Sequence, residues 1–205
     1  MRETDRQLPK MATLSKTPQR KRNNELRARE HLTPAEVNEL RKAARAIGRK
    51  GHRDDTLVLL MFRHALRISE TIALRWEQVD LNQALLHVRR IKNGKPSTHP
   101  LRGIELRALR QLKRECHESP YVFISERKTP LTARTVHHII ARAGEQAQFG
   151  FTVHPHMLRH STGFYLANKG EDTRAIQSYM GHSNIKNTTI YTELSPQRFN
   201  KFFND

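Results

Sequence analysis

Three histidines and an arginine fall within seven residues, in the segment HPHMLRH at 154–160. His156 and Arg159 are three positions apart, so a helix would place a proton carrier beside a fixed, bidentate cation. His156 and His160 have the i, i+4 spacing of a zinc-binding helix. However, Met157 stands where hydrolytic zinc sites carry a glutamate, and Arg159 would bring a permanent positive charge close to the ion. The segment therefore suits a phosphodiester better than a metal.

The overall charge points to the same kind of ligand. The chain has 205 residues, with 37 Lys and Arg against 20 Asp and Glu, and a net charge of +17. Such a protein repels itself unless a polyanion shares its surface, so nucleic acid is the first expectation. RNA, an anionic membrane surface and a merely solvated basic face are the alternatives at this point. Cys116 is the only cysteine, which excludes an intrachain disulfide and a cysteine-rich metal site.

The hydrophobic pattern predicts one folded unit after a polar arm. Residues 1–30 form a basic segment without apolar periodicity, which we interpret as a flexible arm, and 31–205 as the folded domain. Helices are expected at 32–48, 54–66, 67–81 (beginning near Ser69), 103–117, 132–148 and, with breaks, from Pro155 onward. Residues 84–101 predict a small hairpin around Asn93-Gly94, and 121–125 a short buried segment. No run approaches the ~20 apolar residues of a membrane span, and no signal peptide is recognisable, so a cytoplasmic, nucleoid-associated protein is expected.

Four further residues could complete a site for a phosphodiester. Arg67 precedes a predicted helix, Lys92 lies in the predicted hairpin, His182 follows a glycine and Tyr191 comes nine residues later. Each has an ordinary structural alternative: an ion pair of Arg67 with Glu70, an exposed turn lysine, a turn histidine and a packed tyrosine. Taken singly, none indicates catalysis.

Together, the order and spacing of these residues resemble the tyrosine recombinases of the phage integrase family. The resemblance covers residues 32 to about 203. It rests on LRISE, a basic hairpin ending in HPL, HxLRH, GH, and a tyrosine nine residues after that histidine. The segments RHALRISE and HPHMLRHSTGFYLANKG are most similar to the short recombinases that invert promoter DNA in fimbrial phase variation. One departure is that only a thirty-residue arm precedes the domain, where most of these enzymes carry a separate core-binding domain.

The resemblance implies how charge is handled during DNA strand exchange. Arg67 and Arg159 would bind the nonbridging oxygens, where negative charge grows as the phosphorus is attacked. His182 would donate a hydrogen bond to one of these oxygens. Tyr191 would be the nucleophile and form a 3′-phosphotyrosyl link, which conserves the bond energy without ATP.

The resemblance also implies two proton transfers. His156 would accept the proton of the attacking tyrosine, and Lys92 would donate one to the departing 5′-oxygen. His160 would support the arginine or pack. Tyr165 and Tyr179 are rival nucleophiles, but their apolar surroundings in the sequence favour packing roles.

The expected fold is mainly α-helical with a small antiparallel β-sheet. The expected function is site-specific cutting and rejoining of double-stranded DNA with inversion or integration as the outcome, by a homotetramer on two recombination sites and with accessory DNA-bending proteins. No cofactor, metal or membrane partner is expected. Two alternatives remain open from sequence: a type IB topoisomerase, and a DNA-binding regulator with a degenerate site.

Overall fold

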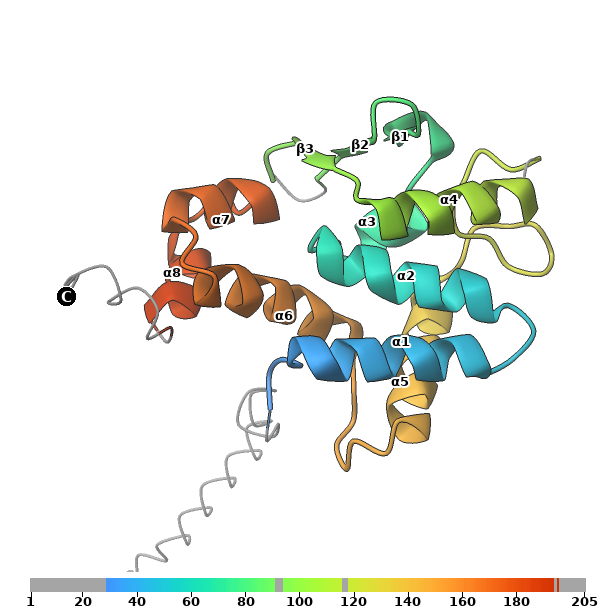
Figure 1. The fold of residues 1–205 in the computed structure, drawn as a ribbon, viewed down its shortest axis with the longest axis horizontal. Coiled ribbons are helices and arrows are strands. Elements are labelled where there is room, and N and C mark those ends of the chain that lie inside the picture. The colour runs from blue at the N-terminus through green and yellow to red at the C-terminus, as the bar shows by residue number, and fades with distance from the viewer. Residues whose placement is uncertain (1–28, 91–93, 116–117, 194, 196–205) are drawn as a thin grey trace, which may run out of the picture.

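Helices make up most of the structure, and a small sheet lies along one side of them (Figure 1). The computed structural model describes residues 29–90, 94–115, 118–193 and 195. The helices of this part are α1 (Pro34–Ala46), α2 (Gly51–Arg63), α3 (Ile68–Ile72), α4 (Gly103–Glu115), α5 (Ala133–Gln146), α6 (Pro155–Asn168), α7 (Thr173–Met180) and α8 (Lys186–Glu193). Its strands are β1 (Val79–Asp80), β2 (Leu85–Val88) and β3 (Ser97–Pro100), and they form an antiparallel sheet in the order β1-β2-β3. The predicted fold class is confirmed. Most of the predicted arm, and Cys116, lie outside the described residues.

The first helix begins as its sequence predicts. The Thr33 hydroxyl accepts a hydrogen bond from the backbone N–H of Glu36, whose carboxylate accepts one from the backbone N–H of Thr33, and Pro34 is the first helical residue. α1 packs against α2 and α5, and its buried side chains belong to the main hydrophobic core. Just before it, the Leu32 N–H donates to the Ser161 hydroxyl at 2.8 Å, which ties the start of the fold to α6.

The segment after α2 makes a sharp turn that matters for the site. α2 is the predicted core helix, and most of its side chains are buried. Ala65 then adopts a φ of 50°, a left-handed conformation that residues other than glycine rarely take. This turn allows α3 to begin three residues later, with Arg67 at its N-terminal cap.

The prediction of one helix over 67–81 is wrong. α3 begins at Ile68, before the expected start at Ser69, and has only five residues. The reason lies in backbone pairing with a distant segment: Val122 donates to the Leu74 carbonyl at 2.9 Å and Trp76 to that of Pro120 at 2.9 Å. These contacts pull the chain out of the helical path, and a short 3-10 turn and β1 follow instead. Local pattern alone could not reveal a partner some 45 residues away.

The predicted hairpin is present as β2 and β3, paired with Leu86 opposite His99. Side chains alternate along β2 and just past it: Leu86, Val88 and Arg90 are buried, whereas His87 and Arg89 are exposed. Arg90 therefore continues the inward face of the strand. Residues 91–93, which include Lys92 and the expected turn residue Asn93, lie outside the described residues.

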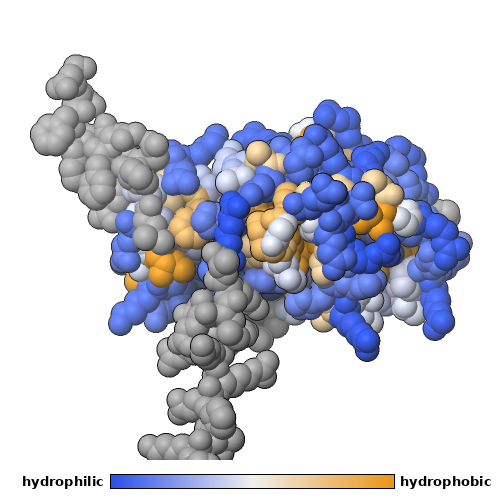
Figure 2. All heavy atoms as spheres, turned by 90° about the horizontal axis from the view of Figure 1, so that it is seen from below, coloured by the Kyte–Doolittle hydropathy of each residue, from blue (hydrophilic) through white to orange (hydrophobic). Residues whose placement is uncertain are grey.

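A second, smaller core lies under α6, α7 and α8. It contains Ala65, Ala167, Ile176, Met180 and Tyr191, all at most 3% exposed. The surface is otherwise polar, and Figure 2 shows hydrophilic side chains over most of one face, with hydrophobic patches between them. Within the described ranges, no helix is long and apolar enough to cross a membrane.

Candidate active site

One face of α6 carries most of the candidate chemistry. His156, Arg159, His160 and Gly163 occupy positions i, i+3, i+4 and i+7, which a helix places in one stripe. The glycine makes room for the aromatic ring of Tyr191 on α8, because a Cβ at Gly163 would lie 2.6 Å from its Cε2 atom. α6 and α8 can therefore approach closely where the histidines and the tyrosine meet.

The hydroxyl of Tyr191 meets an imidazole. Tyr191 is 2% exposed, its Oη lies 3.0 Å from Nδ1 of His160, and its ring packs edge-on against Phe164. Burial raises the pKa of Tyr191 to about 12, although the positive charges of Arg159 and Arg67 oppose the rise. The phenol is thus protonated at neutral pH, and an attack by its oxygen would require a base.

The two histidines of the predicted site, His156 and His182, are held neutral at pH 7. The ring of His156 lies edge-on to that of His160, with centroids 4.4 Å apart. Desolvation lowers the pKa of His156 to about 4, and the charges of His160, Arg159 and Arg67 add to the effect. Nδ1 of His182 lies 2.9 Å from the hydroxyl of Thr188.

The same causes act on His182. Desolvation lowers its pKa to about 3, with further contributions from Arg159, Arg67 and Arg90. An imidazole kept neutral beside three guanidinium groups can donate or accept a hydrogen bond without adding to their charge.

Within the described part of the chain, no group of three or more His, Cys, Asp or Glu side chains is arranged to hold a metal ion.

Arg159 is buried and anchored at the junction of three elements. It is 2% exposed; Nη1 donates to the carbonyl of Ala65, and Nη2 to that of Met180 at 2.7 Å. Burial lowers its pKa to about 9, with contributions from Arg67 and Arg90, so it remains charged at neutral pH. A guanidinium has five N–H donors, and these two contacts use two of them.

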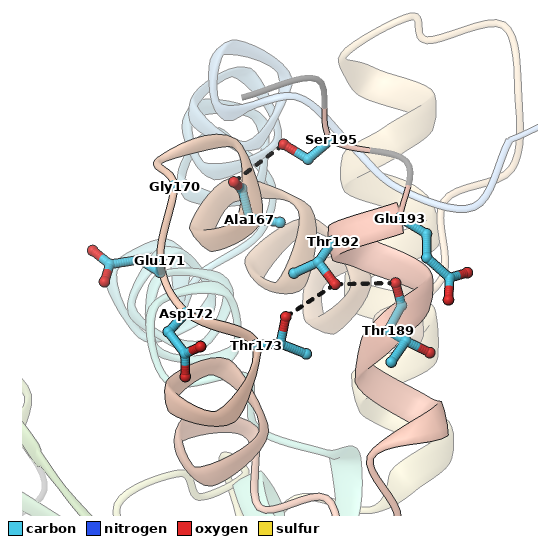
Figure 3. Close-up of a pocket in the computed structure, with 9 residues that line it drawn as sticks. All are labelled: Ala167, Gly170, Glu171, Asp172, Thr173, Thr189, Thr192, Glu193 and Ser195. Carbon is cyan, nitrogen blue, oxygen red and sulfur yellow. Dashed lines mark hydrogen bonds between the residues drawn. The ribbon is translucent and has the colours of Figure 1, made fainter. Parts of the chain in front are cut away.

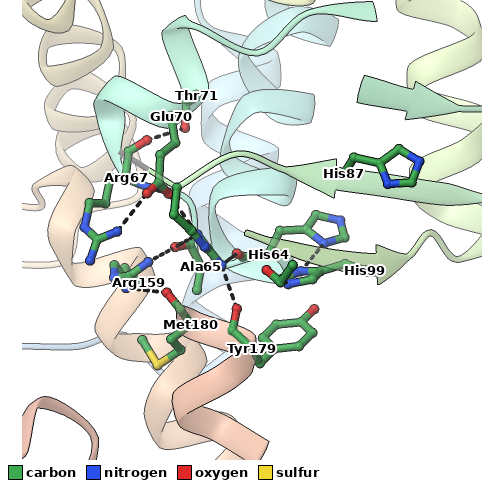
Figure 4. Close-up of polar contacts among 12 residues, drawn as sticks. His64, Ala65, Arg67, Glu70, Thr71, His87, His99, Arg159, Tyr179 and Met180 are labelled. Atoms are coloured by element: carbon green, nitrogen blue, oxygen red, sulfur yellow. Dashed lines mark hydrogen bonds and ion pairs between the residues drawn. The ribbon is translucent and has the colours of Figure 1, made fainter. Parts of the chain in front are cut away.

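Arg67 is the more accessible arginine. Its side chain is 27% exposed, and Nη1 donates to Oε1 of Glu70 at 2.7 Å. Figure 4 shows Arg67 and Arg159 near each other, with Glu70 beside Arg67. The ion pair with Glu70, the structural alternative for Arg67, is therefore present, and it also fixes the direction of the guanidinium.

The structure brings together five of the six predicted residues: Arg67, His156, Arg159, His182 and Tyr191. Lys92 lies outside the described residues, so its predicted role stays a prediction. The rival tyrosines pack elsewhere. Tyr179 donates from its hydroxyl to the Arg63 carbonyl at 2.8 Å and stacks on His99, and Tyr165 packs against Phe62.

Sequence reasoning missed two contributors and understated a third. His160 was expected to support the arginine or pack, and it also contacts the hydroxyl of Tyr191. Arg90 was assigned no role, although the alternation along β2 places it on the buried face, which a basic residue rarely occupies. Gly163, seven positions after His156, could have been found as a small residue in the same helical stripe.

Hydrogen bonds hold the outer side of α8 in place (Figure 3). They lie beside a pocket of about 430 Å³ between α8 and the α6–α7 turn. The Thr173 hydroxyl donates to that of Thr192 at 3.2 Å. The Ser195 hydroxyl donates to the carbonyl of Ala167 at 3.1 Å. The first contact joins α8 to α7, and the second joins the chain just after α8 to α6. Both limit where Tyr191 can lie.

Comparison with known proteins identifies the class. The phage integrase family matches residues 30–198. The chain is 40% identical to the type 1 fimbriae regulatory protein FimE of Escherichia coli K12 over 177 residues, 83% of this chain and 89% of FimE. It is 42% identical to FimB of the same strain over 176 residues, 83% of this chain and 88% of FimB.

Solved structures agree on the fold. The crystal structure of XerA recombinase superposes with a TM-score of 0.74 at 24% identity, over 85% of this chain and 65% of XerA. The XerH recombinase bound to its difH substrate gives 0.72 at 20% identity, over 86% of this chain and 54% of XerH. Fold and relatives together define a site-specific recombinase of the tyrosine class. The chain belongs to the phage integrase family.

Proposed function

We propose that this recombinase inverts a DNA segment between two short inverted sites, and that Tyr191 is its nucleophile. The observation that carries the proposal is the position of the Tyr191 hydroxyl, 3.0 Å from an imidazole and under the influence of the charges of Arg159 and Arg67. A phenol in this setting can form a 3′-phosphotyrosyl link, and the released 5′-hydroxyl can later reverse the link on a new partner strand. The resemblance to recombinases that invert promoter DNA in fimbrial phase variation supports inversion as the outcome, and FimE and FimB, two type 1 fimbriae regulatory proteins, are similar to this chain over most of their length.

The two arginines and His182 would stabilise the pentavalent phosphorus. Arg67 and Arg159 supply fixed guanidinium groups for the nonbridging oxygens, and His182 supplies a neutral hydrogen-bond donor. Preorganisation supports this role: two N–H groups of Arg159 are already held by backbone carbonyls, and Arg67 is held by Glu70. Little reorganisation is then needed when charge develops.

The proton of Tyr191 would leave through a pair of imidazoles. With Nδ1 unprotonated, His160 is the group in direct contact with the hydroxyl, and His156 lies edge-on to it. We therefore propose His160 as the first acceptor and His156, the base expected from sequence, as the group behind it. Lys92 remains the proposed donor to the 5′-oxygen.

Double-stranded DNA is the proposed partner. The XerH structure holds its difH substrate and a lambda integrase dimer holds a core site, and both share this fold. A net charge of +17 favours binding to phosphates, with counterion release as the driving force. We propose that residues 31–205 form the catalytic unit, that the basic segment 1–30 is separate from it, and that a homotetramer with accessory bending proteins joins two sites.

A nicked duplex that traps the covalent intermediate tests the nucleophile. The wild-type protein should form a DNA adduct that survives denaturing electrophoresis, whereas Tyr191→Phe should bind the duplex and form none. Tyr179→Phe is the matched control, because it removes a phenol that donates to a backbone carbonyl away from the cluster. An adduct with Tyr191→Phe would refute the assignment of the nucleophile, and the absence of any wild-type adduct would favour a DNA-binding regulator.

A second substrate tests the acid. Lys92→Ala should cleave an ordinary duplex slowly and recover on a 5′-bridging phosphorothiolate, because a thiolate leaves without protonation. Equal slowness on both substrates would remove Lys92 from the acid role. Joining of two differently labelled duplexes by the wild-type protein separates a recombinase from a topoisomerase, which rejoins only the original strand.

A further inference from the structure

Arg90 is a cation in an unusual place. It follows β2 on the inward face of the alternation, and its side chain is 0% exposed, whereas the neighbouring Arg89 is 68% exposed and pairs with Glu77. Burying a guanidinium is costly unless its donors are satisfied and its charge is paired. The contacts of Arg90 therefore indicate what the buried charge holds in place.

The guanidinium of Arg90 joins three segments of the fold. Nη1 donates to Oε2 of Glu70 at 2.8 Å and to the carbonyl of Ala65 at 3.3 Å. Nη2 donates to the carbonyl of Tyr179 at 2.6 Å and to that of His64 at 3.3 Å. Figure 4 shows these four partners converging from the α2–α3 turn, α3 and α7.

Two partners of Arg90 each also hold a residue of the proposed site. The Glu70 carboxylate uses its other oxygen to bind Arg67 at 2.7 Å. The carbonyl of Ala65, turned by its left-handed backbone, also accepts from Arg159. One buried cation thus sets the direction of both proposed phosphate-binding arginines through two shared acceptors.

The third connection leads to His182. The carbonyls of Tyr179 and Met180, at the C-terminal end of α7, accept from Arg90 and Arg159 respectively. Positive charge at this end of a helix is favourable. Gly181 follows with a φ of 65°, and a Cβ there would lie 2.7 Å from Nε of Arg90, so His182 starts directly against this side chain.

We propose that Arg90 is a positioning residue for strand cleavage: it aligns Arg67, Arg159 and His182 on the scissile phosphate without touching it. The proposal rests on the proposed function of these three residues. A guanidinium buried for stability alone would also need hydrogen bonds to its donors, so the evidence for positioning is that two of its acceptors, Glu70 and the Ala65 carbonyl, also hold Arg67 and Arg159. The two Nη atoms also donate to the carbonyls of Ala65, His64 and Tyr179, whereas Nε has no hydrogen-bond partner among the described residues.

The test compares Arg90→Met with the matched control Arg89→Met at saturating protein on a nicked duplex. Arg90→Met should keep a cooperative thermal transition, at a lower temperature because Glu70 loses a buried ion pair, and should bind DNA but cleave at least tenfold more slowly, whereas Arg89→Met should cleave at the wild-type rate once bound. The discriminating substrate carries a methylphosphonate at the scissile position. It lacks the nonbridging negative charge, so arginine alignment matters less there, and the Arg90→Met defect should shrink several-fold.

Two results would overturn the proposal: wild-type cleavage by Arg90→Met, or a defect of equal size on both substrates, which would make the role purely structural. If Arg90→Met loses its thermal transition, Arg90→Lys is measured in the same way, because one ammonium cannot serve a carboxylate and three carbonyls together. Unfolding of both variants would also overturn the proposal. Failure of the proposed function would appear separately, as an adduct formed by Tyr191→Phe.

Discussion

The contact between His160 and Tyr191 predicts which imidazole takes the proton of the nucleophile. His160→Asn places an amide oxygen near the position of Nδ1, so an acceptor for the Tyr191 hydroxyl remains while the ability to take up a proton at neutral pH is lost. His160→Ala removes both. Because the two variants separate positioning from proton transfer, their comparison distinguishes the two roles.

The size of the effect follows from the pKa of the tyrosine. With a pKa of about 12, about one Tyr191 phenol in 10⁵ is ionised at pH 7, a penalty of about 7 kcal/mol. A positioned base removes part of this penalty, and such groups typically contribute about 10²- to 10⁴-fold. We therefore expect His160→Asn to cleave at least a hundredfold more slowly than the wild-type protein, and His160→Ala to do no better.

The assay is single-turnover formation of the covalent adduct on a nicked duplex at saturating protein, followed from pH 6 to 9. The rate of His160→Asn should rise with pH, because hydroxide replaces the missing base, while the wild-type rate should change less. His156→Asn provides the comparison, and its loss should be smaller. Near-normal cleavage by His160→Asn together with a hundredfold loss in His156→Asn would refute our assignment and restore the base expected from the sequence.

Three further predictions follow from the same geometry. Arg67→Lys and Arg159→Lys keep the charge but lose the planar fork, so each should slow adduct formation about a hundredfold with little change in DNA binding measured by gel shift; a normal rate would remove that arginine from the site. Gly163→Ala would force its Cβ against the Tyr191 ring, so adduct formation should fall while DNA binding persists, and unchanged rates would mean that α8 shifts freely. Burial, His64 and Arg90 lower the pKa of His99 to about 3, so its neutral form stabilises the fold fully above pH 6.5 and this contribution is lost as pH falls. Urea unfolding of the wild-type protein should therefore show a loss of stability between pH 6.5 and 5, and His99→Gln should make that loss smaller by about 2 kcal/mol. An unchanged loss in His99→Gln would contradict this.

The sequence was sufficient to predict the features that depend on residues close together in the chain. The capping box at Thr33, the hairpin strands and the stripe of α6 depend on residues within a few positions of one another, and each is present in the structure. The helix expected over 67–81 was wrong because its end is decided by pairing with residues near 120. Tertiary backbone contacts of this kind leave no periodic signal in either segment.

The same distinction applies to the site. Its residues were nominated from the resemblance to the tyrosine recombinases, but the imidazole that contacts the Tyr191 hydroxyl was not predicted. On the α6 stripe, His156 and His160 are equally histidines, and only the position of α8 brings the hydroxyl to one of them. Arg90 was overlooked for a related reason, since next to Arg89 it reads as one of two basic residues at the end of a strand.

The electrostatics of the site explain why it suits a phosphodiester and how the ligand would change it. Three guanidinium groups, those of Arg67, Arg90 and Arg159, surround a single buried carboxylate, that of Glu70, so the local charge is unbalanced. Their mutual repulsion is one reason why the pKa of Arg159 is lowered, and the same charges help to keep His182 neutral. A scissile phosphate would supply the missing negative charge and relieve this repulsion, and more so as further charge develops on its oxygens. With the proposed roles of these residues, the arrangement would stabilise the transition state of strand cleavage more than the bound substrate.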